Sequence, residues 1–500
     1  MLALRDMADR PQSVAVEKAP SIFEPGRNCW RVANAQRAAA LVDGSVYFRH
    51  LDAALRKARR SIQIVGWAFD GSIRLRPDVD GSPALGPLLR SLVEENPELE
   101  VHILVWSIAV LHAPGAIVPL LIGADWEEHE RITLKLDTQH PIYAAHHQKI
   151  VCIDDRLAFV GGIDLTIQRW DCCDHTIDDP LRCTADGKLY PPVHDIQLAV
   201  DGEAARALGE VARGRWRVAT GDGRAEHAPA EADVWPDGLA AEFTDVPVAI
   251  ARTIAAWGEG AAVGEAAALT ADCLAAARRS IYIEAQYMTA SYIGDILVRH
   301  LAADDGPEIV VIMTHESHGF VEEMVMGNNR DRLIRRLKRA DRHGRLRMLY
   351  PCVPDADGEG RQVLIHSKLI IVDDWFARIG SSNMNNRSMG LDTECDLAIQ
   401  ASEPATRQAV LGLRHRLLAE HLDADPGEVA KAVEANGGSM IKAMERLNTK
   451  KRGLRPFEAL KEKGPIRPAF GTRLLDPKRP FEPMWFLRRK KKSPGTPEFS

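Results

Sequence analysis

The sequence predicts an α/β fold: two tandem α/β/α sandwich lobes, formed by internal duplication and packed into one bilobal unit. A length of 500 residues exceeds one ordinary domain, and 45% hydrophobic with 27% charged residues is typical of a folded chain with a large core. Short apolar strands alternate with segments of helical periodicity, which favours layered α/β architecture. The chain also aligns with itself at one constant offset, so we expect two copies of one unit.

The offset between the two copies is 219 residues. The pentapeptide Ala-Arg-Arg-Ser-Ile occurs at 58–62 and again at 277–281. Further pairs at this offset are His147 and His366, Lys149 and Lys368, Asp154 and Asp373, Asp155 and Asp374, Ala158 and Ala377, and Gly161 and Gly380. The offset holds over about 100 residues without net insertion, which a chance match would not give.

Each half is predicted to open with a helix, continue with two apolar strands and end with two strands joined by a tight turn. In the first half these elements are a helix from Phe48 to Ala58 and strands Ile62–Trp67, Val101–Trp106, Gln148–Ile153 and Leu157–Gly161. In the second half they are a helix capped by Thr270 and ending at Arg279, strands Ile281–Tyr287, Glu308–Met313, Ser367–Val372 and Phe376–Gly380, and a closing helix near Ala405–His421.

Composition indicates the domain boundaries. A stretch rich in Gly, Ala, Pro and Asp marks the linker. Basic residues dominate the end of the chain: residues 440–500 carry 17 Lys and Arg against 6 Asp and Glu, and so contribute +11 to a net charge of −6. The predicted segments are an N-terminal extension 1–25, a first lobe 26–218, a linker 219–242, a second lobe 243–425 and a basic C-terminal extension 426–500.

Each half carries His-x-Lys followed by Asp, at 147–154 and at 366–373. On a strand, residues i and i+2 lie on one face, so His and Lys project side by side and Asp ends the strand. A turn of small residues follows each motif, and its members are Gly161, Gly162, Gly380, Ser381, Ser382 and Asn383.

This pair of motifs fits the cleavage of a phosphodiester. Two lysines and turn amides can neutralise the phosphate oxygens, where negative charge builds up in the transition state. One neutral imidazole can attack phosphorus and form a phosphohistidine, while the other donates a proton to the leaving oxygen and then activates water or an alcohol. The two-step route needs no metal, so we expect no cofactor and no metal site. Symmetry leaves open which histidine is the nucleophile.

The paired motifs and their flanks resemble the phospholipase D superfamily, in particular its eukaryotic-type branch found in bacteria. The flanks that carry the resemblance are 146–150 (HHQKI), 161–165 (GGIDL), 169–171 (RWD) with His175, 192–195 (PVHD), 215–216 (RW), 283–287 (IEAQY), 380–383 (GSSN) and 386–388 (NRS). The similarity extends over roughly residues 30–425. The chain departs from the family pattern at 172–174 (CCD), which affects the expected substrate specificity, and at Ala285.

The resemblance implies a role for each of these residues. His147 matches the nucleophile and His366 the general acid and base. The expected residues are catalytic His147, Lys149, Asp154, His366, Lys368 and Asp373; substrate-binding Gly161, Gly162, Ser381, Ser382, Asn383 and Gln286; and orienting carboxylates Asp171 in the first half and Asp392 or Glu394 in the second. Within this set, Asp154 and Asp373 are expected to be structural, because a carboxylate would repel an anionic substrate.

The remaining histidines and cysteines leave alternatives open. His146 points to the strand face opposite His147, which favours a structural role. His175 and His194 are either hydrogen-bonded structural residues or members of the site. A zinc site is suggested by Cys172, Cys173, His175 and Cys183, but vicinal cysteines rarely bind one ion together and no Cys-x-x-Cys spacing is present.

Few cysteines and an N-terminus without an apolar segment lead us to expect the cytoplasm, peripheral to the inner face of the membrane; export by a specialised secretion system stays open. Residues 101–124 contain no charged side chain, but their His, Pro and Gly favour a buried core or an acyl-chain path over a membrane span. Residues 484–492 place Trp and Phe beside five cations, which suits an anionic membrane surface. The alternatives for this tail are a solvated charge run and contact with nucleic acid.

The expected function is hydrolysis of the distal phosphodiester of phosphatidylcholine-like or phosphatidylethanolamine-like lipids to phosphatidic acid and a head-group alcohol, with transfer to other alcohols. The expected partners are the phospholipid substrate and the membrane surface, with no nucleic acid and no obligate protein partner. The alternatives are a cardiolipin synthase-like phosphatidyltransferase, a nuclease of the same superfamily and a catalytically inactive membrane-binding scaffold. The acidic remainder of the chain disfavours the nuclease, and two intact motifs disfavour the scaffold.

Overall fold

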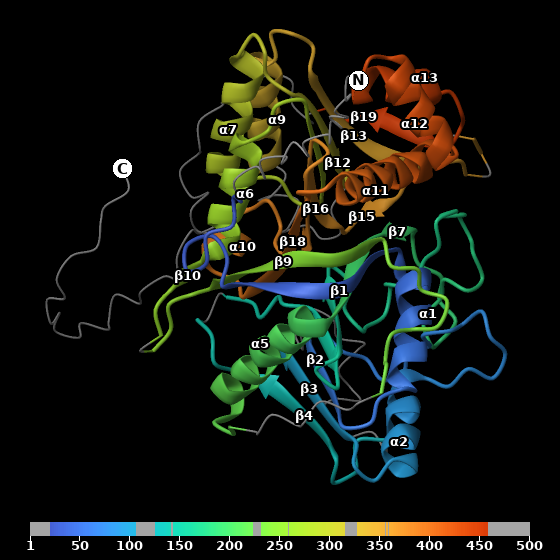
Figure 1. Ribbon diagram of the computed structural model, residues 1–500. Helices are drawn as coiled ribbons and strands as arrows, with labels where there is room; N and C mark the ends of the chain where they lie inside the picture. Colours follow the sequence, from blue (N-terminus) through green and yellow to red (C-terminus); the bar gives the residue numbers. More distant parts are fainter. Residues whose placement is uncertain are drawn as a thin grey trace, which may run out of the picture.

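The computed structural model contains two lobes stacked on one another (Figure 1). The described residues are 21–106, 126–141, 144–223, 232–258, 260–315, 328–355, 357–358 and 360–458. Four predicted segments lie wholly or partly outside them: the N-terminal extension up to residue 20, the uncharged segment at 107–124, the linker at 224–231 and the basic tail at 484–492. Among the described residues, no helix is both long enough and apolar enough to cross a membrane.

The first lobe contains three helices and eight strands in the described ranges. Its elements are β1 (Arg31–Val42), α1 (Gly44–Leu55), β2 (Ser61–Gly66), α2 (Leu85–Glu95), β3 (Glu100–Trp106), β4 (Ile132–Asp137), β5 (Ile150–Ile153), β6 (Leu157–Gly161), β7 (Val193–His194), β8 (Ile196–Asp201) and α5 (Gly202–Thr220).

The second lobe begins with a long strand and contains the C-terminal helices. Its elements are β9 (Phe243–Ile254), β10 (Val263–Gly264), α6 (Glu265–Ala275), β11 (Ser280–Ala285), α7 (Ser291–Ala302), β12 (Glu308–Met313), α9 (Asn328–Ala340), β13 (Leu346–Val353), β14 (Arg361–Gln362), β15 (Leu364–Ile365), β16 (Lys368–Val372), β17 (Phe376–Gly380), α10 (Asn386–Gly390), β18 (Glu394–Gln400), α11 (Pro404–Leu422), α12 (Pro426–Ala435), α13 (Met440–Leu447) and β19 (Gly453–Pro456).

The strand order of one lobe is the same as that of the other. The first lobe has the order β4-β3-β2-β5-β6-β8 and the second has β13-β12-β11-β16-β17-β18, with the first three strands of each parallel and the rest antiparallel. The register also matches, since Ile62 faces Ile153 in one lobe and Ile281 faces Val372 in the other. Two copies of one unit would have this arrangement.

Strand β9 joins the two lobes into one continuous set of paired strands. It pairs with β1 along one edge and with β18 along the other, so that Ile250 has Arg31 as its partner on one side and Leu397 on the other. Strand β1 continues the pairing to β8 of the first lobe. The long β1 and β9 strands therefore cross the boundary between the lobes, as Figure 1 shows near the centre of the molecule.

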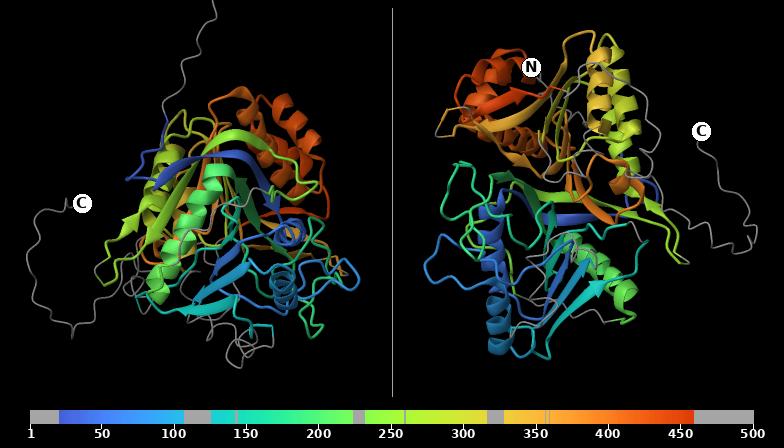
Figure 2. Two further views of the ribbon diagram at one scale, coloured as in Figure 1. Left: turned by 60° about the horizontal axis from the view of Figure 1, so that its bottom comes forward. Right: turned by 180° about the vertical axis from the view of Figure 1, so that it is seen from behind.

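Helices cover both faces of each lobe's strands (Figures 1 and 2). Because successive side chains of a strand point to opposite faces, Val151 of β5 packs with α1 and α2 while Ile150 faces α5. In β16 of the second lobe, Ile370 packs with α6, α7 and α9, whereas Leu369 faces α11 to α13. These fully apolar strands are buried on both faces, which explains why their positions could be read from the sequence.

Two expected boundaries differ from the structure. Thr270 does not cap a helix: α6 begins at Glu265, and the Thr270 hydroxyl donates to the Ala266 carbonyl at 2.7 Å from inside the helix. Residues 426–456 are not an appendix, because α12, α13 and β19 are built into the second lobe and β19 pairs with β13. These elements are amphipathic, and the charged residues on their exposed faces made the average composition of the segment look like that of a basic extension.

The aspartate that closes each motif holds the start of a neighbouring strand. The carboxylate of Asp154 accepts three hydrogen bonds from the backbone N–H groups of residues 59–61, at 2.7 to 2.8 Å. Asp373 accepts three from residues 278–280, at 2.7 to 3.0 Å. Each aspartate lies five residues beyond its motif lysine, roughly 16 Å along an extended strand. Both aspartates were grouped with the catalytic residues because they belong to the motifs. In the structure both have the structural role that we expected from their negative charge.

We expect Asp373→Ala to lower the free energy of unfolding by roughly 2–4 kcal/mol, because it leaves three backbone donors without their acceptor. Urea unfolding followed by circular dichroism measures this change. Asp78→Ala, which breaks a surface pair with Arg76 at 3.0 Å, is the control and should shift the free energy by less than about 0.5 kcal/mol. Equal effects of the two substitutions would remove the anchoring role.

Candidate active site

The two motifs meet because each lobe supplies a backbone acceptor to the other. The N–H of His147 donates to the Thr393 carbonyl at 2.9 Å, and the N–H of His366 donates to the His194 carbonyl at 2.8 Å. Thr393 directly precedes β18, and His194 lies just before β8. The position of each motif histidine is therefore set by the last strand of the other lobe: β18 for His147 and β8 for His366.

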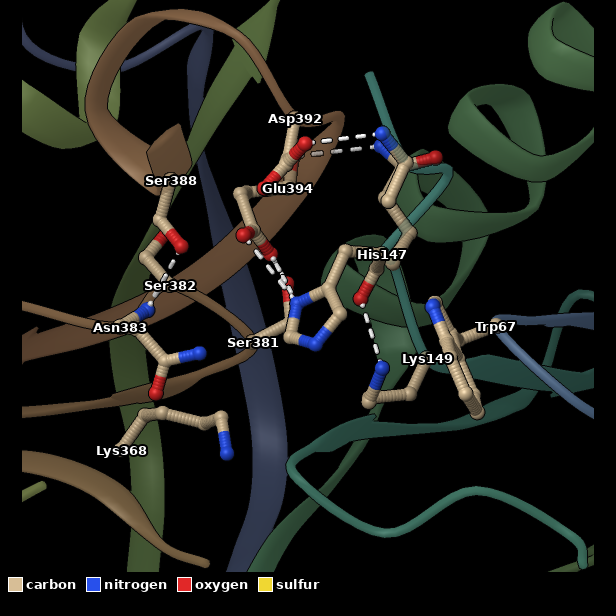
Figure 3. Close-up of polar contacts among 12 residues, drawn as sticks. Trp67, His147, Lys149, Lys368, Ser381, Ser382, Asn383, Ser388, Asp392 and Glu394 are labelled. Carbon is tan, nitrogen blue, oxygen red and sulfur yellow. Dashed lines mark hydrogen bonds and ion pairs between the residues drawn. The ribbon is translucent and has the colours of Figure 1, made fainter. Parts of the chain in front are cut away.

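Each histidine is also oriented by a carboxylate from the opposite lobe. The Nδ1 atom of His147 lies 2.9 Å from Oε2 of Glu394, and Nδ1 of His366 lies 2.7 Å from Oδ2 of Asp195. Both carboxylates are buried. With Nδ1 engaged, the Nε2 atom of each ring is the nitrogen available for reaction. Figure 3 shows the His147 ring with Glu394 at its Nδ1 side.

Two buried lysines lie beside the histidines, and Figure 3 shows both of them together with His147. The Lys149 ammonium donates to the His147 carbonyl at 3.0 Å and lies 3.1 Å from the Asp164 carboxylate. The Lys368 ammonium donates to the His366 carbonyl and to the Gln286 side-chain oxygen, the latter at 3.4 Å. Only 2% of Lys149 and none of Lys368 is exposed, so both charges act in a dry environment where they bind an anion strongly.

Burial and the lysines determine the protonation of this site. The pKa of His147 and that of His366 lie well below the usual value, because both rings are buried and the two ammonium groups disfavour a further positive charge. Burial also lowers the pKa of Lys368 to about 7 and raises the pKa of Glu394 to about 8. Both imidazoles are therefore neutral near pH 7, and Nε2 of His147 is a nucleophile when Glu394 is ionised and accepts the Nδ1–H.

The turns after the motifs contact the last strand of their own lobe, including the orienting carboxylates. Substrate contact was expected for four residues of these turns instead: Gly161, Gly162, Ser381 and Ser382. A Cβ on Gly162 would lie 2.1 Å from Oδ1 of Asp195, and one on Gly161 would lie 1.9 Å from a side-chain oxygen of Gln197. Ser381 donates through Oγ to Glu394 at 2.5 Å, and the Ser382 N–H donates to Asp396 at 3.0 Å. The glycines leave room for the last strand of the lobe to pack against the turn, and the serines form hydrogen bonds with that strand.

Asn383 and Gln286 are the expected binding residues that lie where a substrate could meet them. The Asn383 N–H donates to Ser388 Oγ at 3.1 Å, while its buried side-chain oxygen has no hydrogen-bond partner among the described residues. Gln286 accepts the Lys368 contact already noted, and its amide nitrogen donates to the Tyr287 hydroxyl at 2.9 Å.

Of the three expected orienting carboxylates, only Glu394 contacts a motif histidine. Asp171 instead binds Arg182 at 2.8 Å and His175 at 2.9 Å, away from His147. Asp392 accepts from the Ala145 N–H at 2.8 Å, and so holds the backbone that leads into the first motif. The expectation that each half orients its own histidine was wrong, because the pairs cross between the lobes.

Known proteins are similar to this chain over much of its length. A family model described as a cardiolipin synthase, PLD-like domain, matches residues 271–410. Phospholipase D1 of Saccharomyces cerevisiae is 23% identical over 492 residues, and phospholipase D A of Dictyostelium discoideum is 24% identical over 476 residues. These alignments cover 77% and 76% of this chain but 29% and 35% of the relatives.

The chain belongs to the phospholipase D superfamily. Among solved structures, phosphatidylserine synthase of Haemophilus influenzae Rd KW20 is similar in fold, with a TM-score of 0.52 at 12% identity, over 83% of this chain and 98% of that one. The chain matches 13% of the length of phospholipase D C of Dictyostelium discoideum, to which it is 27% identical over 213 residues. It thus spans about a third or less of these curated phospholipases.

Asp195 is the residue of this phospholipase D superfamily member that sequence reasoning did not assign to the site. Asp195 occupies the position in the first lobe that Glu394 occupies in the second. Asp195 lies two residues before the strand partner of Gly161, and Glu394 lies two residues before the strand partner of Gly380. The two carboxylates are 199 residues apart rather than 219, since the first half has extra residues before its last strand. Aligning the last strands separately would have found it.

Asp195→Asn should lower kcat by roughly 10²–10⁴-fold with little change in KM, because an amide cannot stabilise the His366 imidazolium. Turnover of bis(p-nitrophenyl) phosphate measures it. Asp201→Asn is the matched control, at the far end of β8 and paired with Arg37 at 2.6 Å. A fall in kcat of similar size in both variants would indicate damage to β8 rather than loss of an orienting group.

Glu394→Gln should gain stability relative to the wild type as pH rises from about 4.5 to about 8, and the difference should be constant above that. The sign follows from linkage: with its pKa raised in the folded state, Glu394 holds its proton there but loses it on unfolding in this range, so the wild type is progressively destabilised. Urea unfolding at several pH values measures the difference, and parallel stability curves would contradict the assignment.

Proposed function

We propose that this protein is a phospholipase D: it hydrolyses the distal phosphodiester of glycerophospholipids to phosphatidic acid and a head-group alcohol. The observation that carries the proposal is the crossed pair of buried histidines, each held by a carboxylate of the other lobe beside a buried lysine. A phosphodiester bound there would have both ammonium groups at its non-bridging oxygens and both Nε2 atoms free to react.

In the first step, Nε2 of His147 attacks phosphorus and the bond from phosphorus to the head-group oxygen breaks. His366 donates a proton to the leaving oxygen, so the head group departs as an alcohol. His366 is neutral in the free site, and the arriving anion offsets the lysine charges that disfavour its proton. Asp195 then stabilises the imidazolium through Nδ1.

In the second step, neutral His366 removes a proton from water, and the water oxygen attacks phosphorus. The bond between phosphorus and His147 Nε2 breaks, which releases phosphatidic acid and restores the neutral imidazole. A primary alcohol in place of water gives a phosphatidylalcohol by the same step, so transfer accompanies hydrolysis.

A pocket of about 750 Å³ between the lobes offers room for part of the lipid. Two of its lining residues precede site residues in the sequence: Pro192 lies three residues before Asp195 and Gln362 lies four before His366. Tyr190 and Tyr350 contribute aromatic side chains to its lining, but Arg361 and Arg455 add positive charge, so the lining does not by itself favour a cationic head group. The proposed partners are the phospholipid and the membrane surface that presents it.

Mixed phospholipid vesicles incubated with the protein and a primary alcohol should yield phosphatidic acid and phosphatidylalcohol. His147→Ala and His366→Ala should each reduce both products by at least about 10³-fold, because each step needs both imidazoles. His343→Ala, a partly exposed histidine far from the motifs in sequence, is the control and should be fully active. Products that persist in the His147 variant would overturn the mechanism.

The order of roles is tested with a phosphatidyl-p-nitrophenol substrate, whose leaving group needs no proton. His366→Asn should release one burst of p-nitrophenol and then stall as a phosphohistidine at residue 147, since the general base for the second step is missing. Mass spectrometry of an acid-labile adduct measures it. An adduct on His366 in a His147→Asn protein would reverse the two assignments.

A phosphatidyltransferase of the cardiolipin synthase type is the second candidate, because the family model that matches residues 271–410 has that description. It would use the same two steps with a lipid alcohol as acceptor. The vesicle assay separates the two functions: cardiolipin formed from phosphatidylglycerol, in preference to phosphatidic acid, would favour the transferase.

A further inference from the structure

A second cluster of titratable side chains lies buried between the lobes, beside the active site. Its four central members are Asp43, His175 and His194 from the first lobe and Glu420 from α11 of the second. None is more than 7% exposed. His194 directly precedes the catalytic-site carboxylate Asp195, but the proposed reaction uses none of the four.

One ligand atom of each of the four side chains lies within 4.8 Å of the other three. From Glu420 Oε1, the distance is 2.7 Å to Nδ1 of His194 and 3.1 Å to Nε2 of His175. In Asp43, Oδ1 lies 3.1 Å from Nδ1 of His194 and Oδ2 lies 3.9 Å from Nε2 of His175. Four ligands at the usual 2.0–2.1 Å from a tetrahedral zinc ion would be about 3.3–3.4 Å apart, within this range.

Each histidine has a carboxylate on the nitrogen that points away from the centre. Nδ1 of His175 lies 2.9 Å from Asp171, and Nε2 of His194 lies 3.0 Å from Glu284. Histidines that bind metal in proteins commonly donate their second ring N–H to a carboxylate, which orients the ring and makes the other nitrogen a better ligand. Here both rings have this arrangement, and the other nitrogen of each ring faces Asp43 and Glu420.

Asp43 is the independent sign of a missing partner. It precedes α1 in the position where Asp normally caps a helix, yet its side chain makes no capping bond and turns into the cluster. Both of its carboxylate oxygens are buried, and neither has a hydrogen-bond partner among the described residues. The Nδ1 atom of His194, which has one N–H to give, lies closer to Glu420. A buried carboxylate without a donor is costly unless a cation meets it.

The charges of the surrounding groups point the same way. Four carboxylates gather here, those of Asp43, Asp171, Glu284 and Glu420. Among the contacts that described residues make to them, Arg182, 2.8 Å from Asp171, is the one permanently charged cation. A divalent cation at the centre would balance two of the remaining negative charges.

We propose that Asp43, His175, His194 and Glu420 bind one divalent transition-metal ion of the zinc type, which joins the two lobes next to the active site. Two imidazoles and two carboxylates suit zinc and its neighbours rather than calcium or magnesium, which take oxygen ligands. The ion is structural, because four protein ligands fill its coordination shell and leave no position for substrate. Cys172, one of the cysteines considered for zinc, is not among the four ligands and lies 3.8 Å from Asp179.

The full-length protein, purified without a metal-binding tag, should contain about one zinc ion per chain by elemental mass spectrometry. X-ray absorption at the zinc edge should show about four nitrogen or oxygen ligands at roughly 2.0–2.1 Å and no sulfur near 2.3 Å. Protein stripped with a chelator should recover about one equivalent when zinc is added back, with a rise in its melting temperature.

His175→Gln and Glu420→Gln should each lose most of the bound zinc, whereas His147→Gln should keep it while losing turnover. Folded wild-type protein that takes up no ion from excess zinc, cobalt or manganese would overturn the proposal and leave a protonated histidine network in its place. Zinc retained by both cluster variants, or a sulfur ligand in the absorption spectrum, would overturn the assignment of ligands. These readouts measure the metal directly, so they do not depend on the reaction proposed above.

Discussion

The exchange of partners between the lobes is the interaction on which the site depends. Each motif histidine takes its backbone acceptor and its orienting carboxylate from the other lobe, so neither half contains a complete reacting group. A single lobe would present an imidazole without its carboxylate, and its ring would have no fixed tautomer. The shared site therefore explains why the two units are covalently joined and closely packed.

The burial of two lysines near this exchange of partners is electrostatically unfavourable. Lys149 and Lys368 are buried beside two neutral imidazoles, and burial lowers the pKa of Lys368 to about 7. Asp164 offsets part of this positive charge, and the phosphodiester of the proposed reaction would offset more of it. The buried lysines would then favour the negative charge that develops in the transition state, provided the surrounding strands hold them in place.

The sequence predicted the core strands well, because runs such as Leu157–Gly161 and Phe376–Gly380 are buried on both faces and end at small residues. It also placed the histidines and lysines at matching positions of the two halves, although in the structure only Lys368 lies on a strand, while His147, Lys149 and His366 lie just before β5 and β16. It could not show which carboxylate serves which histidine, since that contact is made between lobes; Asp195 was missed for this reason. Nor could composition reveal α12 and α13, whose apolar residues are interleaved with charged ones.

The double pairing of β9 has a consequence for turnover. Because this strand is bonded to β1 on one edge and β18 on the other, separating the lobes would break two rows of backbone hydrogen bonds at once. The paired strands therefore oppose any motion that separates the halves. For the lipid of the proposed reaction, entry and release would then depend on parts of the molecule other than these shared strands.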